Sequence, residues 1–354
     1  MSTHGTSVLV VGGGVVGLMS AYALAKKGAR VDLVDAGAGG TESSWAGGGI
    51  VCPVPPWKYG RRVEQSVARS RDLFRAWLPE IEGLSGIDCE YRSTGLLLSA
   101  DPSHSDFVAL SQGWRGQTSE RVLLGQRQDF ESSLPNGDWP AVLLPDVPQI
   151  RNPRLVHALM MANRALGVAI HAHCPVERLS QQPGGTISAW RGDQTVWTGE
   201  QVVLAAGAWS DDILVASGLA PLGVFPVRGQ MLLYRMDPSS APAHIIHTGE
   251  GYLIPRMDGH ILAGSTAETV GFDRTPTQQA YQQISEMATA QWPRLREARL
   301  ISHWTGLRPS YSLDDPAMGW LFEDWPGLWI NTGHFRNGLG LAPACAERTA
   351  EALC

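Results

Sequence analysis

The pattern of apolar and polar residues near the start of the chain predicts one complete structural unit. Residues 8–11 and 31–34 are short apolar runs, and uninterrupted runs of this kind are typical of buried parallel strands. Between them, apolar residues recur every three to four positions over 15–27, which predicts a helix, and Gly28 follows where glycine commonly ends one. The pattern therefore predicts a strand–helix–strand unit with parallel strands.

Helical and strand-like patterns both occur along the rest of the chain, without an internal repeat. Further helices are predicted over 63–78, 152–166 and 278–291, and the segment 327–353 predicts a strand, a glycine loop and a final helix. The other segments with strand character are 95–98, 176–179, 186–197 (as a hairpin), 202–206, 222–233, 252–255 and 261–263. This mixture predicts an α/β (α+β) fold, in which a Rossmann-like nucleotide-binding domain is interrupted by an antiparallel or mixed-sheet substrate domain.

A glycine-rich turn, Gly12-x-Gly14-x-x-Gly17, joins the first strand to its helix. The first glycine permits the tight turn, the second lets the backbone approach a pyrophosphate, and the third lets the helix pack on the strand. The helix N-terminus would present free N–H groups and the positive end of its dipole to the phosphates. Asp35 ends the second strand, 18 positions after Gly17, near the spacing of a carboxylate that binds a ribose hydroxyl. Strand, helix and acid in register favour dinucleotide binding over a purely structural turn.

Two further segments are suited to close approach of a ligand to the backbone. "VVLAAGAWS" (202–210) runs from a strand into a turn of small residues, and "NTGHFRNGLGLAPA" (331–344) is a second glycine loop that leads into a helix. Both FAD and NAD use a glycine turn like the one at 12–17. Together with that turn, the segments 202–210 and 331–344 make three separate sites of close approach, which favour a bound cofactor that extends beyond the phosphates alone.

Composition and charge argue against several other classes of protein. The formal net charge is −6, whereas a nucleic-acid-binding protein should carry a basic domain or face. No apolar run approaches the roughly 20 residues that span a bilayer, and the N-terminal "MSTHGTS" lacks the features of a signal peptide. The five cysteines contain no C-x-x-C pair, and the close pairs His171/His173 and His244/His247 lack matching metal ligands. We therefore expect a cytoplasmic protein without nucleic acid, transmembrane segment, disulfide framework or metal.

The motifs taken together resemble a known family. They are "VLVVGGGVVGLMSAYALAKKGARVDLVDAG", "SSWAGGGIV", "VVLAAGAWS", "GLRP" and "GHFRNGLGLAPA", and they are similar to the D-amino-acid oxidase-like flavoproteins, especially the glycine oxidase (ThiO-type) group. The resemblance spans residues 8–353, and the combination of the second, fourth and fifth motifs is its most specific part.

The resemblance implies a division of the chain and a mode of cofactor binding. The implied FAD-binding domain consists of 1–88, 148–218 and 302–354, and the implied substrate-binding domain of 89–147 and 219–301. Related sarcosine oxidases attach flavin covalently, but their H-C-x-x-x-T pattern is absent here. The resemblance therefore implies non-covalent FAD.

Three residues match positions that the family uses to bind substrate. Arg308, in "GLRP", is the implied anchor of the substrate carboxylate, and a guanidinium suits this role because its planar fork binds both oxygens and keeps its charge. Arg336, in "HFRNG", is implied to lie near the substrate and the flavin, and Tyr252, in "GYLIP", to line the substrate pocket. The competing interpretations are a surface ion pair of Arg308 with Asp314 or Asp315, a structural ion pair of Arg336, and a core position for Tyr252.

The resemblance also implies a large set of cofactor-binding residues. Asp35 and Ala36 are the expected ribose ligands, although family members often carry glutamate at the first of these positions. The other implied FAD-binding residues are Gly12, Gly14, Val15, Val16, Gly17, Ser43, Ser44, Gly48, Gly49, Ile50, Val176, Ala206, Gly207, His334, Phe335, Arg336, Asn337, Gly338, Leu339 and Gly340.

The implied reaction is oxidative deamination of a small amine or amino acid by hydride transfer to flavin N5. Glycine, sarcosine, D-alanine and D-proline represent the expected substrates, and the products are an oxo acid, ammonia or an amine, and hydrogen peroxide when oxygen is the acceptor. No protein base is required for a neutral amine, because the flavin supplies the electron chemistry and the protein supplies positioning. Ala267 stands where glycine oxidases carry methionine, which predicts a larger pocket.

Two alternative functions stay open at this point. "SSWAGGGIVCPVPPWKY" also resembles flavin subunits of multi-subunit dehydrogenases for glycine or D-hydroxyproline, and Trp45 and Trp57 could belong to the face that binds partner subunits. A non-catalytic nucleotide-binding or redox-sensing module is the second alternative, but it would not need the carboxylate clamp implied by "GLRP" and "GHFRNG". The preferred substrate, and the choice between a homo-oligomer and partner subunits, are also left open.

Overall fold

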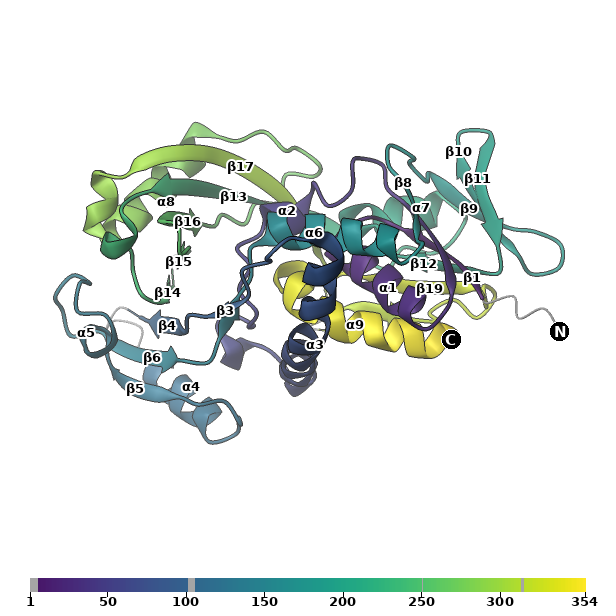
Figure 1. Ribbon diagram of the computed structural model, residues 1–354. Helices are drawn as coiled ribbons and strands as arrows, with labels where there is room; N and C mark the ends of the chain where they lie inside the picture. Colours follow the sequence, from purple (N-terminus) through teal and green to yellow (C-terminus); the bar gives the residue numbers. More distant parts are fainter. Residues whose placement is uncertain (1–5, 101–105, 250, 313–314) are drawn as a thin grey trace.

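The computed structural model describes residues 6–100, 106–249, 251–312 and 315–354, which form two lobes, each built on a large sheet (Figure 1). The lobe on the right of Figure 1 contains a six-stranded sheet, and the lobe on the left contains an eight-stranded sheet. The predicted α/β (α+β) class, with a mixed-sheet unit interrupting a Rossmann-like unit, is confirmed. The proposed domain boundaries stay a prediction.

The six-stranded sheet has the order β18–β19–β12–β1–β2–β8, and all its pairs are parallel except β18–β19. Its strands are β1 (Ser7–Val11), β2 (Arg30–Val34), β8 (Ala169–His171), β12 (Gln201–Leu204), β18 (Ala317–Gly319) and β19 (Leu328–Thr332). Successive side chains of a strand point to opposite faces, so Val8 and Val10 pack in one core while Leu9 and Val11 pack in another. Both faces are therefore covered, which explains the uninterrupted apolar runs.

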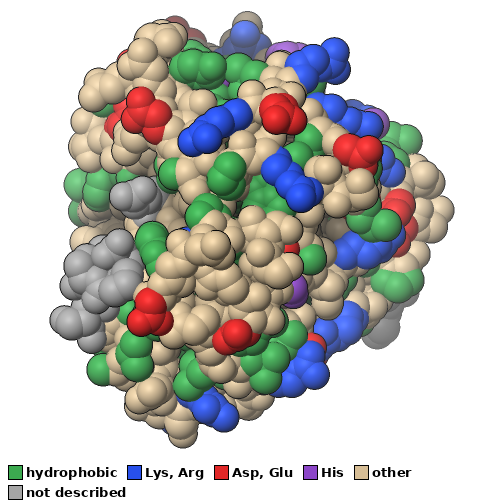
Figure 2. Space-filling view, turned by 90° about the vertical axis from the view of Figure 1, so that its left-hand side faces the viewer, with side chains coloured by type: hydrophobic (Ala, Val, Ile, Leu, Met, Phe, Trp, Pro, Cys, Tyr) green, Lys and Arg blue, Asp and Glu red, His purple; other side chains and the backbone are tan. Residues whose placement is uncertain are grey.

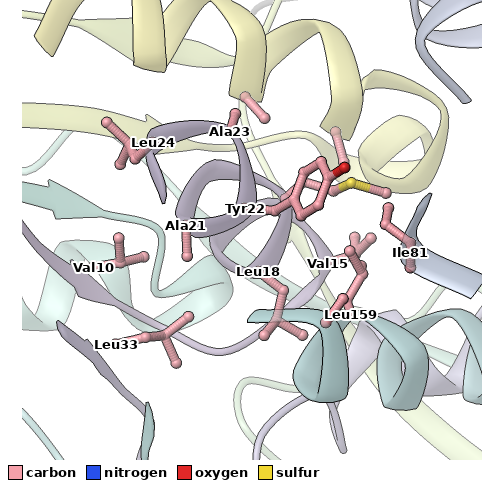
Figure 3. Close-up of a cluster of buried hydrophobic side chains, with 14 of the residues drawn as sticks. Val10, Val15, Leu18, Ala21, Tyr22, Ala23, Leu24, Leu33, Ile81 and Leu159 are labelled. Carbon is pink, nitrogen blue, oxygen red and sulfur yellow. The ribbon is translucent and has the colours of Figure 1, made fainter. Parts of the chain in front are cut away.

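Four helices pack in the core on one side of this sheet. They are α1 (Val15–Lys26), α3 (Arg61–Ser85), α6 (Asn152–Ala165) and α9 (Gly338–Leu353). Figure 3 shows Leu18 and Tyr22 of α1 in this core, together with Leu33 of β2, Ile81 of α3 and Leu159 of α6. The opposite side carries α7 (Ser210–Ala216) and a small sheet of β9 (Arg178–Gln181), β10 (Ile187–Arg191) and β11 (Gln194–Gly199).

Helix α3 continues beyond its predicted end. The sequence predicts a helix over 63–78, and a proline inside a helix lacks an N–H and clashes with the preceding turn. The helix instead runs through Pro79 to Ser85, and Gly86, with a φ of 71°, follows it. Leu78 and Ile81 on either side of the proline are buried in the same core, so tertiary packing keeps the second half helical.

The eight-stranded sheet has the order β17–β13–β16–β15–β14–β4–β6–β5 and is antiparallel except for β14–β4. Its strands are β4 (Leu96–Ser99), β5 (Leu123–Gln126), β6 (Pro140–Leu144), β13 (Phe225–Arg235), β14 (Ile245–Thr248), β15 (Gly251–Pro255), β16 (His260–Gly264) and β17 (Arg299–Ser310). Helix α8 (Gln278–Gln291) packs on one face through Ile284 and Met287. Acidic and basic side chains lie interspersed on the face at this end of the molecule (Figure 2).

Short elements connect these parts. They are α2 (Ser43–Ala46), α4 (Asp106–Arg115), α5 (Arg127–Phe130), β3 (Arg92–Ser93), β7 (Pro148–Gln149), η1 (Pro56–Lys58), η2 (Gly207–Trp209), η3 (Pro238–Ser240), η4 (Pro293–Arg296) and η5 (Phe335–Asn337). Among the described helices, none is long and apolar enough to cross a membrane. Over the same residues, no three His, Cys, Asp or Glu side chains are grouped to hold a metal ion, and all five cysteines are free thiols.

Candidate active site

A cavity of about 630 Å³ lies where the two large sheets meet. Residues at the carboxyl ends of β1, β2, β12 and β19 line one side, and residues of β15 and β17 line the other. Ligands of parallel α/β sheets bind at the edge where the strands end, and the volume is within the range of small-molecule sites. The predicted site residues that line it are Gly12, Gly14, Val15, Val16, Asp35, Ala36, Ser43, Ser44, Gly48, Gly49, Ile50, Val176, Ala206, Gly207, Tyr252, Arg308, His334, Phe335, Arg336, Asn337, Gly338 and Leu339.

Two predicted cofactor residues, Gly17 and Gly340, do not line the cavity. A Cβ on Gly17 would lie 1.9 Å from the carbonyl oxygen of Gly12, so this glycine lets α1 pack against the turn. Gly340 lies in the first turn of α9, where an added Cβ would meet Val67 of α3 at 3.6 Å. The predicted packing role of Gly17 agrees with this geometry, and a direct contact of either glycine with FAD stays a prediction.

The first glycine turn has the backbone that the sequence predicts. Gly12 has a φ of 108°, and a Cβ there would lie 2.3 Å from the carbonyl oxygen of Ala205. Asp35 accepts a hydrogen bond from the N–H of Gly13 at 2.7 Å, and Ser44 Oγ accepts one from the N–H of Val15 at 2.9 Å. The strand end and the 43–44 segment thus hold the turn in place beside the cavity.

Val176 reaches the cavity from a loop. The sequence predicts a strand over 176–179, whereas β9 begins at Arg178. The preceding loop is tied to the end of β2, because the N–H of Cys174 donates to the carbonyl of Asp35 at 2.8 Å. This link carries Val176 to the same end of the cavity as Asp35.

The Gly48–Gly49 segment depends on two residues that the sequence analysis did not single out. Arg256, at the end of the "GYLIPR" segment, donates from Nη2 to the carbonyl of Gly48 at 3.0 Å and also hydrogen-bonds Gln149. Burial, with a smaller contribution from the nearby positive charge of Arg151, lowers the pKa of Arg256 to about 10. A Cβ on Gly49 would lie 2.0 Å from a backbone oxygen, so this segment admits no side chain.

The C-terminal loop contributes a buried polar group. His334 is 4% exposed, and burial lowers its pKa to about 4, so its imidazole is neutral at physiological pH. Within the described part of the chain, its Nε2 has no hydrogen-bond partner, and the residue lines the cavity. Asn152 also lines the cavity and has a buried Oδ1 without a partner over the same residues. Unsatisfied buried polar atoms, together with the open space beside Gly12, fit a polar dinucleotide ligand.

Arg308 occupies the other end of the cavity. It lies on β17, where a Cβ on Gly229 of the neighbouring strand would come within 2.2 Å of its guanidinium. Its Nη1 donates to the carbonyl of Thr266 at 3.0 Å, and its Nη2 donates to Ser265 Oγ at 2.7 Å. The alternative partner Asp315 instead lies 3.6 Å from Arg62, and Asp314 is outside the described residues. Among the residues that the structure describes, no carboxylate contacts the Arg308 guanidinium.

Tyr252, Arg336 and His247 surround Arg308 in the cavity. Burial lowers the pKa of Arg308, while the neighbouring Tyr252 opposes this shift and the charge of Arg336 adds to it. The phenol of Tyr252 itself donates to Met231 Sδ at 3.3 Å. Tyr252 also stacks against His247, with ring centroids 6.5 Å apart and an interplanar angle of 25°. The sequence analysis considered His247 only as a metal ligand, and no local pattern distinguishes it, because its place depends on the pairing of β14 with β15.

Three further positions that the sequence analysis discussed lie outside the cavity lining. Ala267 is exposed, so the prediction that its small side chain enlarges the pocket is not supported. Trp45 is 41% exposed and contacts Trp304 edge-on at 5.6 Å. Trp57 packs against aromatic rings of its own chain and is partly buried.

Comparison with known proteins agrees with this geometry. Residues 7–352 match the DAO family of FAD dependent oxidoreductases. A glycine oxidase of Pseudomonas putida is 39% identical over 349 residues, which cover 98% of this chain and 94% of that protein. The crystal structure of a glycine oxidase from Geobacillus kaustophilus has a TM-score of 0.92 at 26% identity, covering 99% of this chain and 95% of that one. An L-proline dehydrogenase from P. horikoshii, with a TM-score of 0.82 at 19% identity over 98% of this chain and 93% of that one, shares the fold alone. The chain therefore belongs to the family of FAD dependent oxidoreductases, and FAD is its cofactor.

Proposed function

We propose that the enzyme oxidises small α-amino acids and related amines, in the manner of the glycine oxidases that it resembles. The observation that carries the proposal is the Arg308 guanidinium, which lines the cavity beside Tyr252 without contacting a carboxylate of the described residues. A cation enclosed by protein favours an anionic ligand, and its planar fork matches a carboxylate. The 39% identity to a glycine oxidase favours this activity over a partner-dependent dehydrogenase or a non-catalytic module.

The cavity residues divide into two groups under this proposal. Gly12, Gly14 and the N-terminus of α1 would hold the pyrophosphate of FAD, Asp35 and Ala36 the ribose, and Val176 the adenine side. The segments that would surround the flavin ring are 43–44 and 48–50, which also reach the pyrophosphate, and the loop that begins at His334. When bound, FAD supplies two-electron oxidation of the carbon–nitrogen bond of the substrate. Arg308 would hold the substrate carboxylate, and the phenol of Tyr252 beside it would donate the second hydrogen bond.

The charges at this end of the cavity also favour the reactive form of the amine. Arg308 and Arg336 both line the cavity. His247, which also lines it, is neutral, because burial and the charges of Arg336 and Lys58 lower its pKa to about 4. Two fixed positive charges disfavour a substrate ammonium and so favour the neutral amine. A protein base is then unnecessary, and the imine product hydrolyses to an oxo acid and ammonia, while oxygen is reduced to hydrogen peroxide.

The remaining assignments are part of the same proposal. The FAD-binding domain would consist of 1–88, 148–218 and 302–354, and the substrate-binding domain of 89–147 and 219–301.

Five free thiols suit the reducing cytoplasm, which we propose as the location. Light scattering of the purified protein would separate a homo-oligomer from a monomer, and co-purification would reveal partner subunits.

The proposal is tested by mixing the holoenzyme with substrate, first without and then with oxygen. Glycine, sarcosine, D-alanine and D-proline are added in turn, and the visible absorbance of the flavin is followed. Bleaching that reverses in air, with release of peroxide, is the expected result, and Arg308→Met should raise KM for each substrate by about 100-fold or more. Bleaching that persists in air would replace the oxidase by a dehydrogenase, and no bleaching with any amino acid would overturn the substrate class.

A further inference from the structure

Arg256 is a buried cation whose hydrogen bonds all go to neutral groups. Its side chain is 6% exposed, and over the described residues its Nε has no partner. Nη1 donates to Gln149 Oε1 and to the carbonyl of Ile150 at 3.2 Å, and Nη2 donates to the carbonyl of Gly48 at 3.0 Å. Burying a cation without an ion pair costs free energy, and groups of this kind concentrate at functional sites.

The acids nearest to Arg256 are paired with other cations. Glu90 and Asp258 both act on the pKa of Arg256, but they lie 3.0 and 2.9 Å from Arg151. Glu90 also lies 3.6 Å from Arg154. Burial, together with the charge of Arg151, lowers the pKa of Arg256 to about 10, so the guanidinium stays charged at physiological pH. Its charge therefore acts on the neutral groups that it contacts.

One of these groups belongs to the wall of the cavity. Gly48 and Gly49 line the cavity, whereas Arg256 does not. The peptide bond between the two glycines is trans, and the C=O and N–H of a trans peptide point in opposite directions. The N–H of Gly49 therefore points away from Arg256, and it has no hydrogen-bond partner among the described residues. A cation on the carbonyl polarises this peptide and makes its N–H a stronger donor.

The Gly48 peptide lies toward the end of the cavity that contains Arg308. A Cβ on Gly48 would lie 3.4 Å from the ring of Tyr252. Tyr252 pairs with Gly264 of the next strand, and the following residue, Ser265, accepts from Arg308 Nη2 at 2.7 Å. The glycine turn before α1, which would hold the pyrophosphate, lies at the other end. We therefore expect this peptide to face the flavin ring.

We propose that Arg256 raises the reduction potential of FAD by polarising the Gly48–Gly49 peptide, whose N–H donates to the flavin ring. The inference rests on the proposed placement of 48–50 around that ring. The ring gains negative charge when it accepts a hydride, and a fixed donor backed by a cation stabilises this charge more than it stabilises the oxidised ring. Arg256 is thus a positioning residue that acts through the peptide.

The first experiment titrates the oxidised holoenzyme with sulfite, which adds to the flavin ring and leaves it negatively charged. Arg256→Met removes the charge and keeps an unbranched side chain. It should raise the Kd for sulfite about tenfold, which corresponds to about 30 mV in a two-electron potential. Arg256→Lys, which keeps the charge, should recover part of the affinity. No amino acid is added, so the result does not depend on oxidase activity.

Arg71→Met is the matched control. Arg71 is also buried, and its Nε donates to the carbonyl of Val51 at 2.9 Å, three positions after Gly48. Its charge is neutralised by Glu120 at 2.6 Å, and Val51 does not line the cavity. Both methionine variants should lower the Tm, but Arg71→Met should leave the Kd for sulfite unchanged.

The second experiment measures the midpoint potential directly, by reduction together with a reference dye. It excludes a contribution from binding of the sulfite anion to the arginines of the cavity. Gln149→Glu places an acid where Gln149 accepts from Arg256, so it neutralises the charge while the bond to Gly48 stays. The potential should fall in Arg256→Met and in Gln149→Glu, and the second variant decides the matter if the first does not fold.

The outcomes separate this inference from the proposed function. Potentials equal to the native value in Arg256→Met and Gln149→Glu, or an equal fall in Arg71→Met, would overturn the inference. A weaker affinity for FAD with an unchanged potential would also overturn it, because the peptide would then act on the pyrophosphate. If the potential falls as expected but no amino acid reduces the flavin, the inference stands and the proposed substrate class falls.

Discussion

Replacing Glu268 by glutamine tests how the Arg308 guanidinium is held. Glu268 accepts hydrogen bonds from Arg228 Nη2 at 2.6 Å and from Gln230 Nε2 at 2.9 Å. Thr266 Oγ1 donates to the same carboxylate, and the carbonyl of Thr266 accepts from Arg308 Nη1 at 3.0 Å. Glu268 thus fixes the loop that fixes Arg308, although it does not line the cavity itself.

The expected effect follows from these contacts. Glutamine keeps the shape of Glu268 but has no charge and presents an NH₂ group where one oxygen now accepts. The substitution weakens one charge-assisted hydrogen bond to the buried Arg228 and places the new NH₂ group against a hydrogen-bond donor. Together these effects should lower the free energy of unfolding by about 2–3 kcal/mol. Unfolding entropy scales with chain length at about 2.1 cal/mol/K per residue, so this loss lowers the Tm of the chain by about 3 °C. A looser Arg308 should lose about 1 kcal/mol of carboxylate binding, which raises KM about fivefold with kcat nearly unchanged.

Asp273→Asn is the matched control. Asp273 accepts from Nη1 of the same Arg228 at 2.6 Å, but its side chain is 51% exposed and it does not bond Thr266. Differential scanning of both holoenzymes and steady-state kinetics with glycine measure the two effects separately. The control should lower the Tm less and leave KM unchanged. Equal KM values in Glu268→Gln and Asp273→Asn would refute the view that Glu268 acts on Arg308 through Thr266.

Three further predictions concern the cofactor, pH and specificity. Gly12→Ala should abolish FAD retention, measured by the absorbance ratio of the purified protein. The control Gly28→Ala also changes a left-handed glycine, with a φ of 87°, but its added Cβ would have no atom within 4 Å, so it should lower the free energy of unfolding by only about 1–2 kcal/mol. Equal loss of FAD in the two variants would contradict a steric cause. Because burial lowers the pKa of His334 from 6.5 to about 4, its neutral state stabilises the fold above pH 6.5, and this contribution is lost as pH falls toward 4. Chemical denaturation between pH 7 and 4 should show a steeper loss in the native chain than in His334→Asn, and parallel curves would exclude this role. Ala267→Met should leave the ratio of glycine to D-proline turnover unchanged, since Ala267 is exposed and does not line the cavity. A shift in that ratio would show that Ala267 does shape the substrate pocket.

The sequence by itself determined the features that depend on neighbouring residues in the chain. The turn at Gly12, the helix that follows it and the position of Asp35 at a strand end all come from short-range spacing, and the structure has them where expected. Helix α8 has the predicted bounds Gln278–Gln291, because its apolar period and its capping Thr277 are both local. The resemblance to a flavoprotein family rested on the same kind of continuous segment.

Only the tertiary structure decided which charges lack partners and which residues share the cavity. Arg256 donates a hydrogen bond to the carbonyl of Gly48, which is more than two hundred positions away in the sequence. His247 faces Tyr252 because β14 pairs with β15. Helix α3 continues through Pro79 because the residues around it are buried in a common core. Desolvation and ion pairing depend on all groups nearby in space, and the order of residues along the chain does not encode those distances directly.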